Sequence, residues 1–101
     1  MAKHTSNPSI EYLVHGFLTL QTADECRKFL FDICTDSELM EMSRRLQAAK
    51  MLKTGMVYTE IAEHTGLSTA TISRVNRCFK YNENCGYDIV LERLDKGGRR
   101  R

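Results

Sequence analysis

Two arginines and several small hydroxyl side chains recur at helical spacing between residues 68 and 80 of this 101-residue chain. Guanidinium groups bind phosphates or guanine edges, and hydroxyl groups bind phosphates or bases. The small residues come first in this stretch, where they let a backbone approach a groove closely, and no acidic residue interrupts it. We therefore predict that a DNA-contacting face is made of the following residues: Ser68, Thr69, Ala70, Ser73, Arg74, Arg77 and Lys80.

The apolar residues around this face predict two short helices joined by a tight turn, a helix-turn-helix over residues 58–80. Gly66 suits the end of the first helix, because a residue without Cβ enters positive φ at little cost. Ser68 suits the N-cap of the second helix, and Ile72 and Val75 have the spacing of an inward face. An ordinary pair of packed helices with the same turn is the alternative.

Charge is distributed unevenly along the chain, although the net charge is only +2. Residues 1–43 hold three Lys or Arg against seven Asp or Glu, whereas residues 44–101 hold twelve against six. The half that contains residues 58–80 is therefore the basic half, as expected for a surface that binds phosphates. The alternative is that this uneven distribution of charge arose by chance on a solvated surface.

Cysteine, histidine and hydropathy patterns argue against several other classes of protein. The four cysteines form no C-x-x-C pair and the three histidines are scattered, so no metal site is expected. No apolar run is long enough to span a membrane, and the N-terminus lacks the apolar core of a secretory signal. We expect a cytoplasmic protein whose cysteines are small core residues or free thiols. An enzyme is not expected, because His64 lies near Glu60 and Glu63 but no activated nucleophile accompanies it.

The remaining segments read as helices too, which predicts an all-α fold without strands. Ser9 is the expected cap of the first helix, and Thr22 with Glu25 and Thr35 with Glu38 have the spacing of capping boxes. We expect a single domain over residues 9–95, with a flexible arm before it and a basic tail after it that either seeks phosphates or serves solubility. The six helices, counted with their caps, are expected to begin at residues 9, 22, 35, 58, 68 and 87, and the last is expected to end at residue 95. The arm covers residues 1–8 and the tail covers residues 96–101.

The chain resembles the tryptophan-repressor superfamily in the order of its expected elements, which are a capped helix over 35–54, a glycine, and the two helices of 58–80. The segment TADECRKFLFDICTDSELMEMSRRLQAAKML is more specifically similar to the YerC/YecD branch. The resemblance implies an intertwined homodimer that presents two recognition helices to successive major grooves of a roughly palindromic double-stranded DNA operator, about 34 to 36 Å apart. A transcriptional regulator, expected to be a repressor, is the implied function. The alternative is a protein-interaction module that keeps the same shape.

The resemblance also implies a place for a small-molecule corepressor between the long helix and the recognition helix. Val75, however, stands where the tryptophan repressor has the glycine that leaves room for the indole, and one residue is missing between Gly55 and Gly66. We therefore expect either a different small ligand or none, rather than tryptophan. The positions whose residue types match the ligand contacts of the family are Thr35, Arg45, Thr71 and Arg74.

Overall fold

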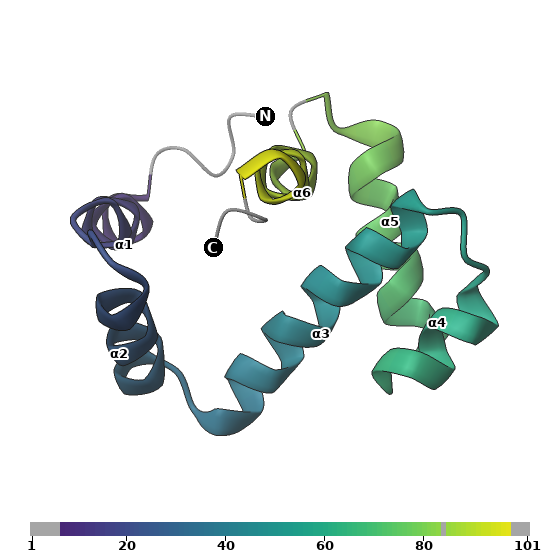
Figure 1. Ribbon diagram of the computed structural model, residues 1–101, viewed down its shortest axis with the longest axis horizontal. Helices are drawn as coiled ribbons and strands as arrows, with labels where there is room; N and C mark the ends of the chain where they lie inside the picture. The colour runs from purple at the N-terminus through teal and green to yellow at the C-terminus, as the bar shows by residue number, and fades with distance from the viewer. Residues whose placement is uncertain (1–6, 84, 98–101) are drawn as a thin grey trace. The chain divides into compact units, whose positions relative to one another are not determined.

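The computed structural model describes residues 7–83 and 85–97, and this part of the chain contains six α-helices and no strand, as predicted (Figure 1). Its contacts divide the chain into two compact units, one ending at Leu39 and the other beginning at Met40. The predicted arm and tail lie largely outside the described residues. The helices are α1 (Pro8–Leu18), α2 (Ala23–Ile33), α3 (Asp36–Lys53), α4 (Tyr58–Thr65), α5 (Thr69–Tyr81) and α6 (Gly86–Gly97).

The cap of helix α1 is Asn7, two residues before Ser9, the cap that the sequence suggested. The Asn7 carboxamide oxygen accepts hydrogen bonds from the backbone N–H groups of Ser9 (2.9 Å) and Ile10 (3.2 Å). Pro8 occupies the first turn, where its fixed φ suits the helix and its missing N–H costs nothing. The prediction placed the cap after the proline, whereas the proline belongs to the helix.

Helices α2 and α3 begin at the two threonines that were predicted to cap them. Thr22 Oγ1 accepts from the Glu25 N–H at 3.1 Å, and Thr35 Oγ1 accepts from the Glu38 N–H at 3.1 Å. Glu38 closes its box by accepting from the Thr35 N–H at 2.8 Å. Glu25 instead accepts from the N–H of Gln21, one residue earlier. Both starts are therefore fixed by local hydrogen bonds.

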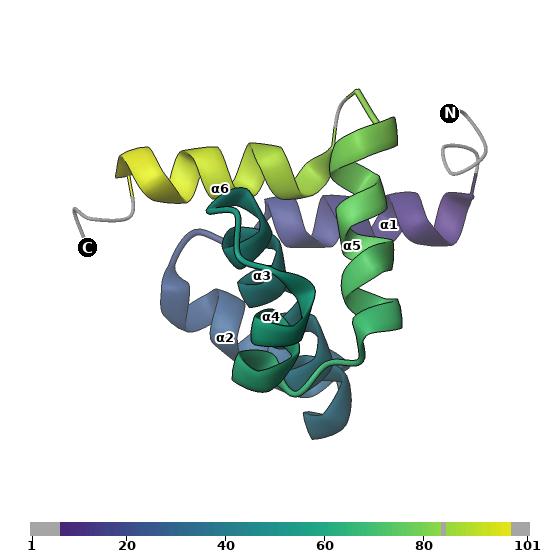
Figure 2. The same ribbon diagram turned by 90° about the vertical axis from the view of Figure 1, so that its right-hand side faces the viewer.

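The core of the second unit brings α3, α4 and α5 together. Ala48 on α3, Ile61 on α4, and Leu67 and Ile72 around the start of α5 form one buried cluster. Fully burying an isoleucine side chain contributes about 1.5 to 3 kcal/mol, and both isoleucines here are fully buried. Helix α4 lies beside α5, and α6 runs across the end of α5 (Figure 2). Helix α5 is therefore held through the face that carries Ile72 and Val75, whereas Arg74 and Arg77 on its other face are exposed.

Helix α6 extends two residues past its predicted end, into the segment expected to be a tail. The ion pair of Lys96 with Glu92 (3.3 Å), at helical spacing, supports this last turn. At the other end, the Lys53 amine of α3 lies 2.8 Å from the Asp88 carboxylate and 5.1 Å from the centre of the Phe79 ring. Lys53 thus contacts both α5 and α6 near their junction.

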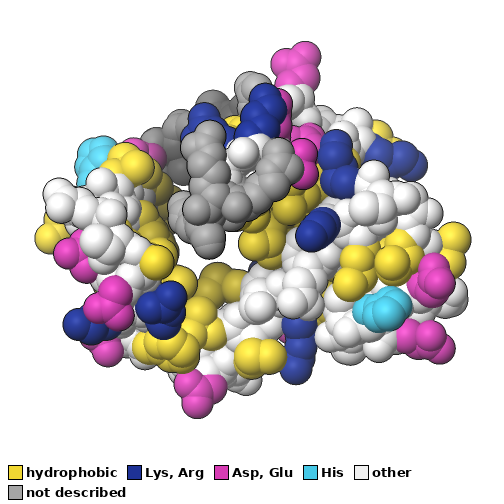
Figure 3. Space-filling view, in the orientation of Figure 1, with side chains coloured by type: hydrophobic (Ala, Val, Ile, Leu, Met, Phe, Trp, Pro, Cys, Tyr) yellow, Lys and Arg dark blue, Asp and Glu magenta, His cyan; other side chains and the backbone are white. Residues whose placement is uncertain are grey.

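The first unit has no such core, because α1 and α2 contain no buried side chain. Phe17 packs edge-on against Phe29, with 5.2 Å between the ring centroids. Apolar side chains are visible on the surface of these two helices, among polar and charged ones (Figure 3). Its exposed large apolar residues are Ile10, Tyr12, Leu13, Val14, Phe17, Leu18, Phe31 and Ile33.

Candidate nucleic-acid interface

The turn between α4 and α5 is fixed by a glycine and a buried threonine. Gly66 has φ of +80° and its N–H donates to the Ala62 carbonyl at 2.8 Å, which ends α4 as predicted. The hydroxyl of Thr65 donates to the Ile61 carbonyl at 2.8 Å and accepts from the Leu67 N–H at 3.2 Å. These bonds set the direction in which the chain enters α5.

Helix α5 begins at the predicted cap. The Ser68 oxygen accepts from the Thr71 N–H at 3.1 Å, and the Ser68 hydroxyl donates to Thr71 Oγ1 at the same distance. A capping side chain of this kind stabilises a helix start by about 1 kcal/mol. The first backbone N–H groups of α5 thus start from an ordered position, with the small side chains of Thr69 and Ala70 exposed beside them.

The structure places all seven predicted contact residues on α5 or its cap. Ile72 and Val75 face the core and are 0% and 5% exposed, so the opposite face is the outward one. No aspartate or glutamate occurs between Thr69 and Tyr81. The outward residues Ser68, Thr69, Ala70, Arg74, Arg77 and Lys80 are exposed, and Ser73 is half-buried. This is a positively charged, hydroxyl-bearing helix face without a nearby carboxylate on the same helix.

The sequence reasoning missed a pocket of about 260 Å³ between the start of α4 and the second half of α5. Three of its lining residues were predicted contacts, and the other three were not. Asn76 and Tyr81 follow Ser73 and Arg77 at helical spacing, which could have included them in the face, but Tyr58 joins only through the packing of α4. The pocket is lined by Tyr58, Ser73, Asn76, Arg77, Lys80 and Tyr81. Phenol, amide, guanidinium and ammonium donors around a small pocket suit a phosphate oxygen.

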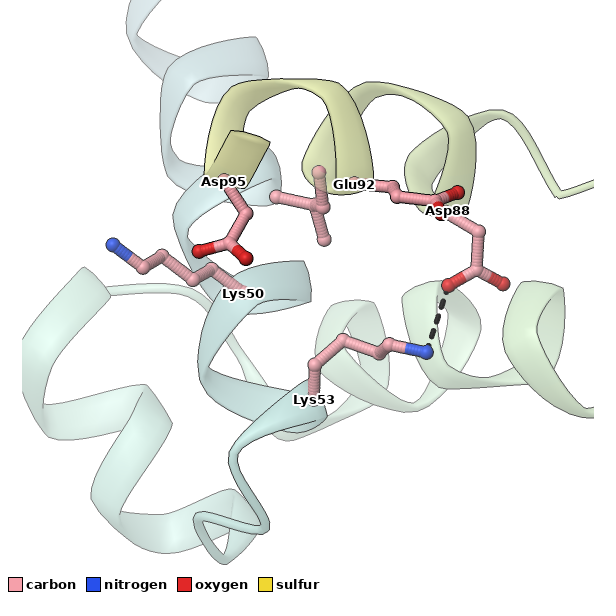
Figure 4. A pocket seen from close by; sticks show the side chains of 6 residues that line it. Lys50, Lys53, Asp88, Glu92 and Asp95 are labelled. Atoms are coloured by element: carbon pink, nitrogen blue, oxygen red, sulfur yellow. Dashed lines mark ion pairs between the residues drawn. The ribbon is translucent and has the colours of Figure 1, made fainter. Parts of the chain in front are cut away.

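Carboxylates of this unit gather on other helices. Glu60, Glu63 and His64 are exposed on α4. A second pocket, of about 480 Å³, lies between the end of α3 and α6 and is lined by two lysines, three carboxylates and Leu91. Figure 4 shows the amine of Lys53 directed at Asp88 across this pocket. The carboxylates that line this pocket outnumber its lysines, so the pocket does not suit an anion.

Three of the four residues suggested as ligand contacts are engaged in local interactions, and the fourth, Arg74, is exposed. Thr35 caps α3, and Thr71 accepts from Ser68. The Arg45 guanidinium pairs with Glu41 at 3.4 Å, and Arg74 is exposed on α5. Val75 is buried.

Two groups near the α5 and α6 junction have shifted pKa values. Burial raises the pKa of the Tyr87 phenol, and the nearby positive charge of Arg45 opposes that shift. Burial, followed by its hydrogen bond with Cys85, raises the pKa of the Cys78 thiol. The raised pKa values keep both groups neutral to a higher pH than an exposed thiol or phenol.

Metal-binding clusters and membrane-spanning helices are both absent from the part of the chain that the structure describes. No group of three or more His, Cys, Asp or Glu side chains there is arranged to hold a metal ion. None of the helices described is both long and apolar enough to cross a bilayer.

Comparison with known proteins gives consistent matches along most of the chain. The family model described as Trp repressor protein matches residues 9–95. The uncharacterized protein YerC of Bacillus subtilis (strain 168) is 41% identical over 85 residues, which cover 84% of this chain and 81% of YerC. A crystal structure of a TrpR like protein from Eubacterium eligens ATCC 27750 is 47% identical, with a TM-score of 0.81 over 89% of this chain and 92% of that one. A structure described as a "putative Trp repressor" from Staphylococcus aureus is 38% identical, with a TM-score of 0.83 over 94% of each chain.

Proposed function

Because this chain belongs to the Trp repressor protein family, we propose that it is a sequence-specific DNA-binding regulator of transcription that acts as a homodimer. Repression is the expected mode, since an operator-bound dimer blocks access to the DNA it covers. The site is the outward face of α5, with Arg74 and Arg77 as the base or phosphate contacts. The remaining contacts are Ser68, Thr69, Ala70, Ser73 and Lys80.

The observation that carries this proposal is the composition of the outward face of α5. The core holds the helix through Ile72 and Val75, and the free side offers small residues at the start and cations further along. Small residues let a helix enter a major groove, and arginines then read guanine edges or bind phosphates. The pocket beside Tyr58 adds polar donors where the DNA backbone would pass. An enzyme would need a cleft with activated groups instead.

The homodimer is supported by the apolar surface of α1 and α2. These helices expose eight large apolar side chains and bury none within one chain. Contiguous exposed apolar surface of this kind marks an interaction site, and a second copy of the same chain would cover it symmetrically. Two α5 helices related by a two-fold axis would then read a roughly palindromic operator.

We also propose that tryptophan is not the corepressor. The Val75 side chain is packed in the core beneath α5, at the position where the tryptophan repressor carries glycine. Arg45 pairs with Glu41 and lies close enough to Tyr87 to act on its pKa. An effector, if one acts here, is therefore a different small molecule.

Selection of double-stranded DNA from a random pool, with the purified full chain, tests the proposal. We expect enrichment of a near-palindromic sequence, with or without tryptophan in the buffer. Arg74→Ala and Arg77→Ala should each weaken binding to that sequence by about 1 to 3 kcal/mol if the arginine reads a base. Affinity should also fall steeply with salt, because phosphate contacts release counterions.

Arg93→Ala provides the matched control, because Arg93 is an exposed arginine of α6. It removes the same charge and should leave the affinity close to that of the unchanged protein. Unaltered binding in both α5 variants would show that the recognition face is wrongly assigned. Failure to enrich any sequence at physiological salt would favour the protein-interaction module.

A further inference from the structure

Two of the four cysteines meet at the junction of α5 and α6. The Cys85 thiol lies 2.7 Å from Cys78 Sγ and donates a hydrogen bond to it. Cys78 is on the last full turn of α5, and Cys85 precedes α6, where its carbonyl accepts from the N–H groups of Asp88 and Ile89. The chain turns back between the two, so residues seven apart in sequence bring their sulfur atoms together. Proposed DNA contacts do not involve either sulfur.

The two sulfur atoms differ in their access to solvent. Cys85 is 1% exposed, whereas Cys78 is half-buried and also accepts a hydrogen bond from the Asn82 side chain at 3.4 Å. A reagent in solution therefore reaches Cys78 first, and Cys85 is positioned behind it. This is the arrangement of an attacking thiol with a resolving thiol.

We propose that Cys78 and Cys85 form a reversible dithiol and disulfide pair that covalently joins the end of α5 to the start of α6. The oxidant is a low-molecular-weight disulfide such as oxidised glutathione. Because burial raises the pKa of the Cys78 thiol, the step proceeds through the small fraction of Cys78 that has lost its proton to solvent. That thiolate attacks one sulfur atom of oxidised glutathione, which forms a mixed disulfide, breaks the glutathione S–S bond and releases one glutathione thiolate that takes up a proton. The Cys85 thiolate then attacks Cys78 Sγ and releases the second glutathione. The two cysteines lose two electrons and two protons, and one oxidised glutathione becomes two reduced ones.

The other two cysteines provide an internal comparison. Cys26 lies on α2 and Cys34 ends the same helix. Eight residues along an α-helix span about 12 Å, which exceeds the distance of about 7 Å between Cα atoms that a disulfide tolerates. These two thiols therefore cannot join within one chain while α2 is intact, although both are half-buried like Cys78.

Closure would act on the element that carries the proposed DNA contacts. Cys78 directly follows Arg77 and precedes Lys80 on α5. The same junction is already tied by the packing of Phe79 on Tyr87, with ring centroids 6.0 Å apart. A disulfide would replace the thiol hydrogen bond with a covalent link at a place where the sulfur atoms already touch. Disulfides of this kind in reducing compartments are redox-sensing rather than structural.

Incubation of the folded full chain in glutathione buffers, followed by alkylation, trypsin digestion and mass spectrometry, tests the proposal. Trypsin cuts after Arg77, Lys80 and Arg93, so the two cysteines fall in separate peptides, 78–80 and 81–93. In excess oxidised glutathione we expect these peptides to be linked, with a mass decrease equal to two hydrogen atoms, while Cys26 and Cys34 are not linked to each other. Excess reduced glutathione should reopen the link.

Single variants test the order of the two steps. Cys85→Ser should trap glutathione on Cys78, whereas Cys78→Ser should leave Cys85 unmodified because it is buried. A double variant, Cys26→Ser with Cys34→Ser, should close as the unchanged chain does. The proposal is overturned if the link forms only in urea, if Cys78 keeps glutathione in the unchanged chain, or if Cys85 is the residue that takes up glutathione. These readouts do not depend on DNA binding.

Discussion

The hydroxyl group of Thr65 holds together the turn that leads into α5, so its removal should destabilise the protein measurably. Thr65 is the buried polar residue of the described core, 6% exposed, and it satisfies the buried N–H of Leu67. Thr65→Val keeps the shape of the side chain and removes only its hydrogen-bonding capacity. The Leu67 N–H then loses its partner where water does not reach it.

The expected loss follows from that unpaired group. Leaving a buried donor unsatisfied costs about 1 to 3 kcal/mol. No cavity opens, because valine and threonine have nearly the same volume. The decrease in unfolding free energy therefore reflects the lost hydrogen bonds rather than a packing defect. The unfolding free energy falls with urea concentration by about 2 kcal/mol per molar, so a variant that is less stable by about 2 kcal/mol should have a urea midpoint lower by about 1 M. Protein concentration must be held constant, since association with a second copy would contribute to stability.

Thr65→Ser is the matched control for this measurement. Serine keeps both hydrogen bonds of the hydroxyl and loses one methyl group, for a loss of about 0.8 kcal/mol. We expect the valine variant to be the less stable of the two, although it is the more apolar. Equal stability of Thr65→Val and the unchanged protein, or a greater loss in Thr65→Ser, would refute the role assigned to this hydroxyl.

Two further predictions concern the start and the end of α5. Ser68→Ala should lower the unfolding free energy by about 1 kcal/mol, because the Thr71 N–H loses its cap, whereas Ser68→Asp should keep stability yet weaken DNA binding through its charge. The reduced protein should lose stability as the pH rises above about 9, measured by urea unfolding across that range. The reason is that the folded state raises the pKa of Cys78 above its ordinary 9.0 and that of Tyr87 above 10.0, so the unfolded state releases these protons first. Cys78→Ser should remove the part of this stability loss that begins near pH 9.

The features that the sequence predicted well are those decided within a few residues. The caps at Thr22, Thr35 and Ser68 formed as their spacing indicated, because each needs only a side-chain oxygen and an N–H three residues later. Gly66 adopted positive φ for an equally local reason. Asn7 was missed although the rule was available, because the proline after it was read as the end of an arm rather than as a first helical residue.

The features that the sequence could not predict depend on packing between distant segments. Tyr58 joins the α5 face only because α4 packs beside it, and Cys85 reaches Cys78 only because the chain turns back after α5. No periodicity in either segment of the sequence predicts these contacts. The division of the contacts into two units has a related cause. The apolar stripes of α1 and α2 look like core positions in the sequence, but within one chain they do not become buried.

The two units therefore differ in what stabilises them, and this difference supports the assignment of separate tasks. The second unit buries Ala48, Ile61, Leu67 and Ile72 in a core of its own, so α5 is held in place by its own chain. Helices α1 and α2 have eleven residues each and no buried side chain, and isolated helices of this length are marginal in water. Caps worth about 1 kcal/mol cannot make up that deficit. Their stability must come from apolar contacts outside their own pair, and the homodimer proposed above would supply them, because the second copy exposes the same apolar face and would also present a second α5 to the DNA.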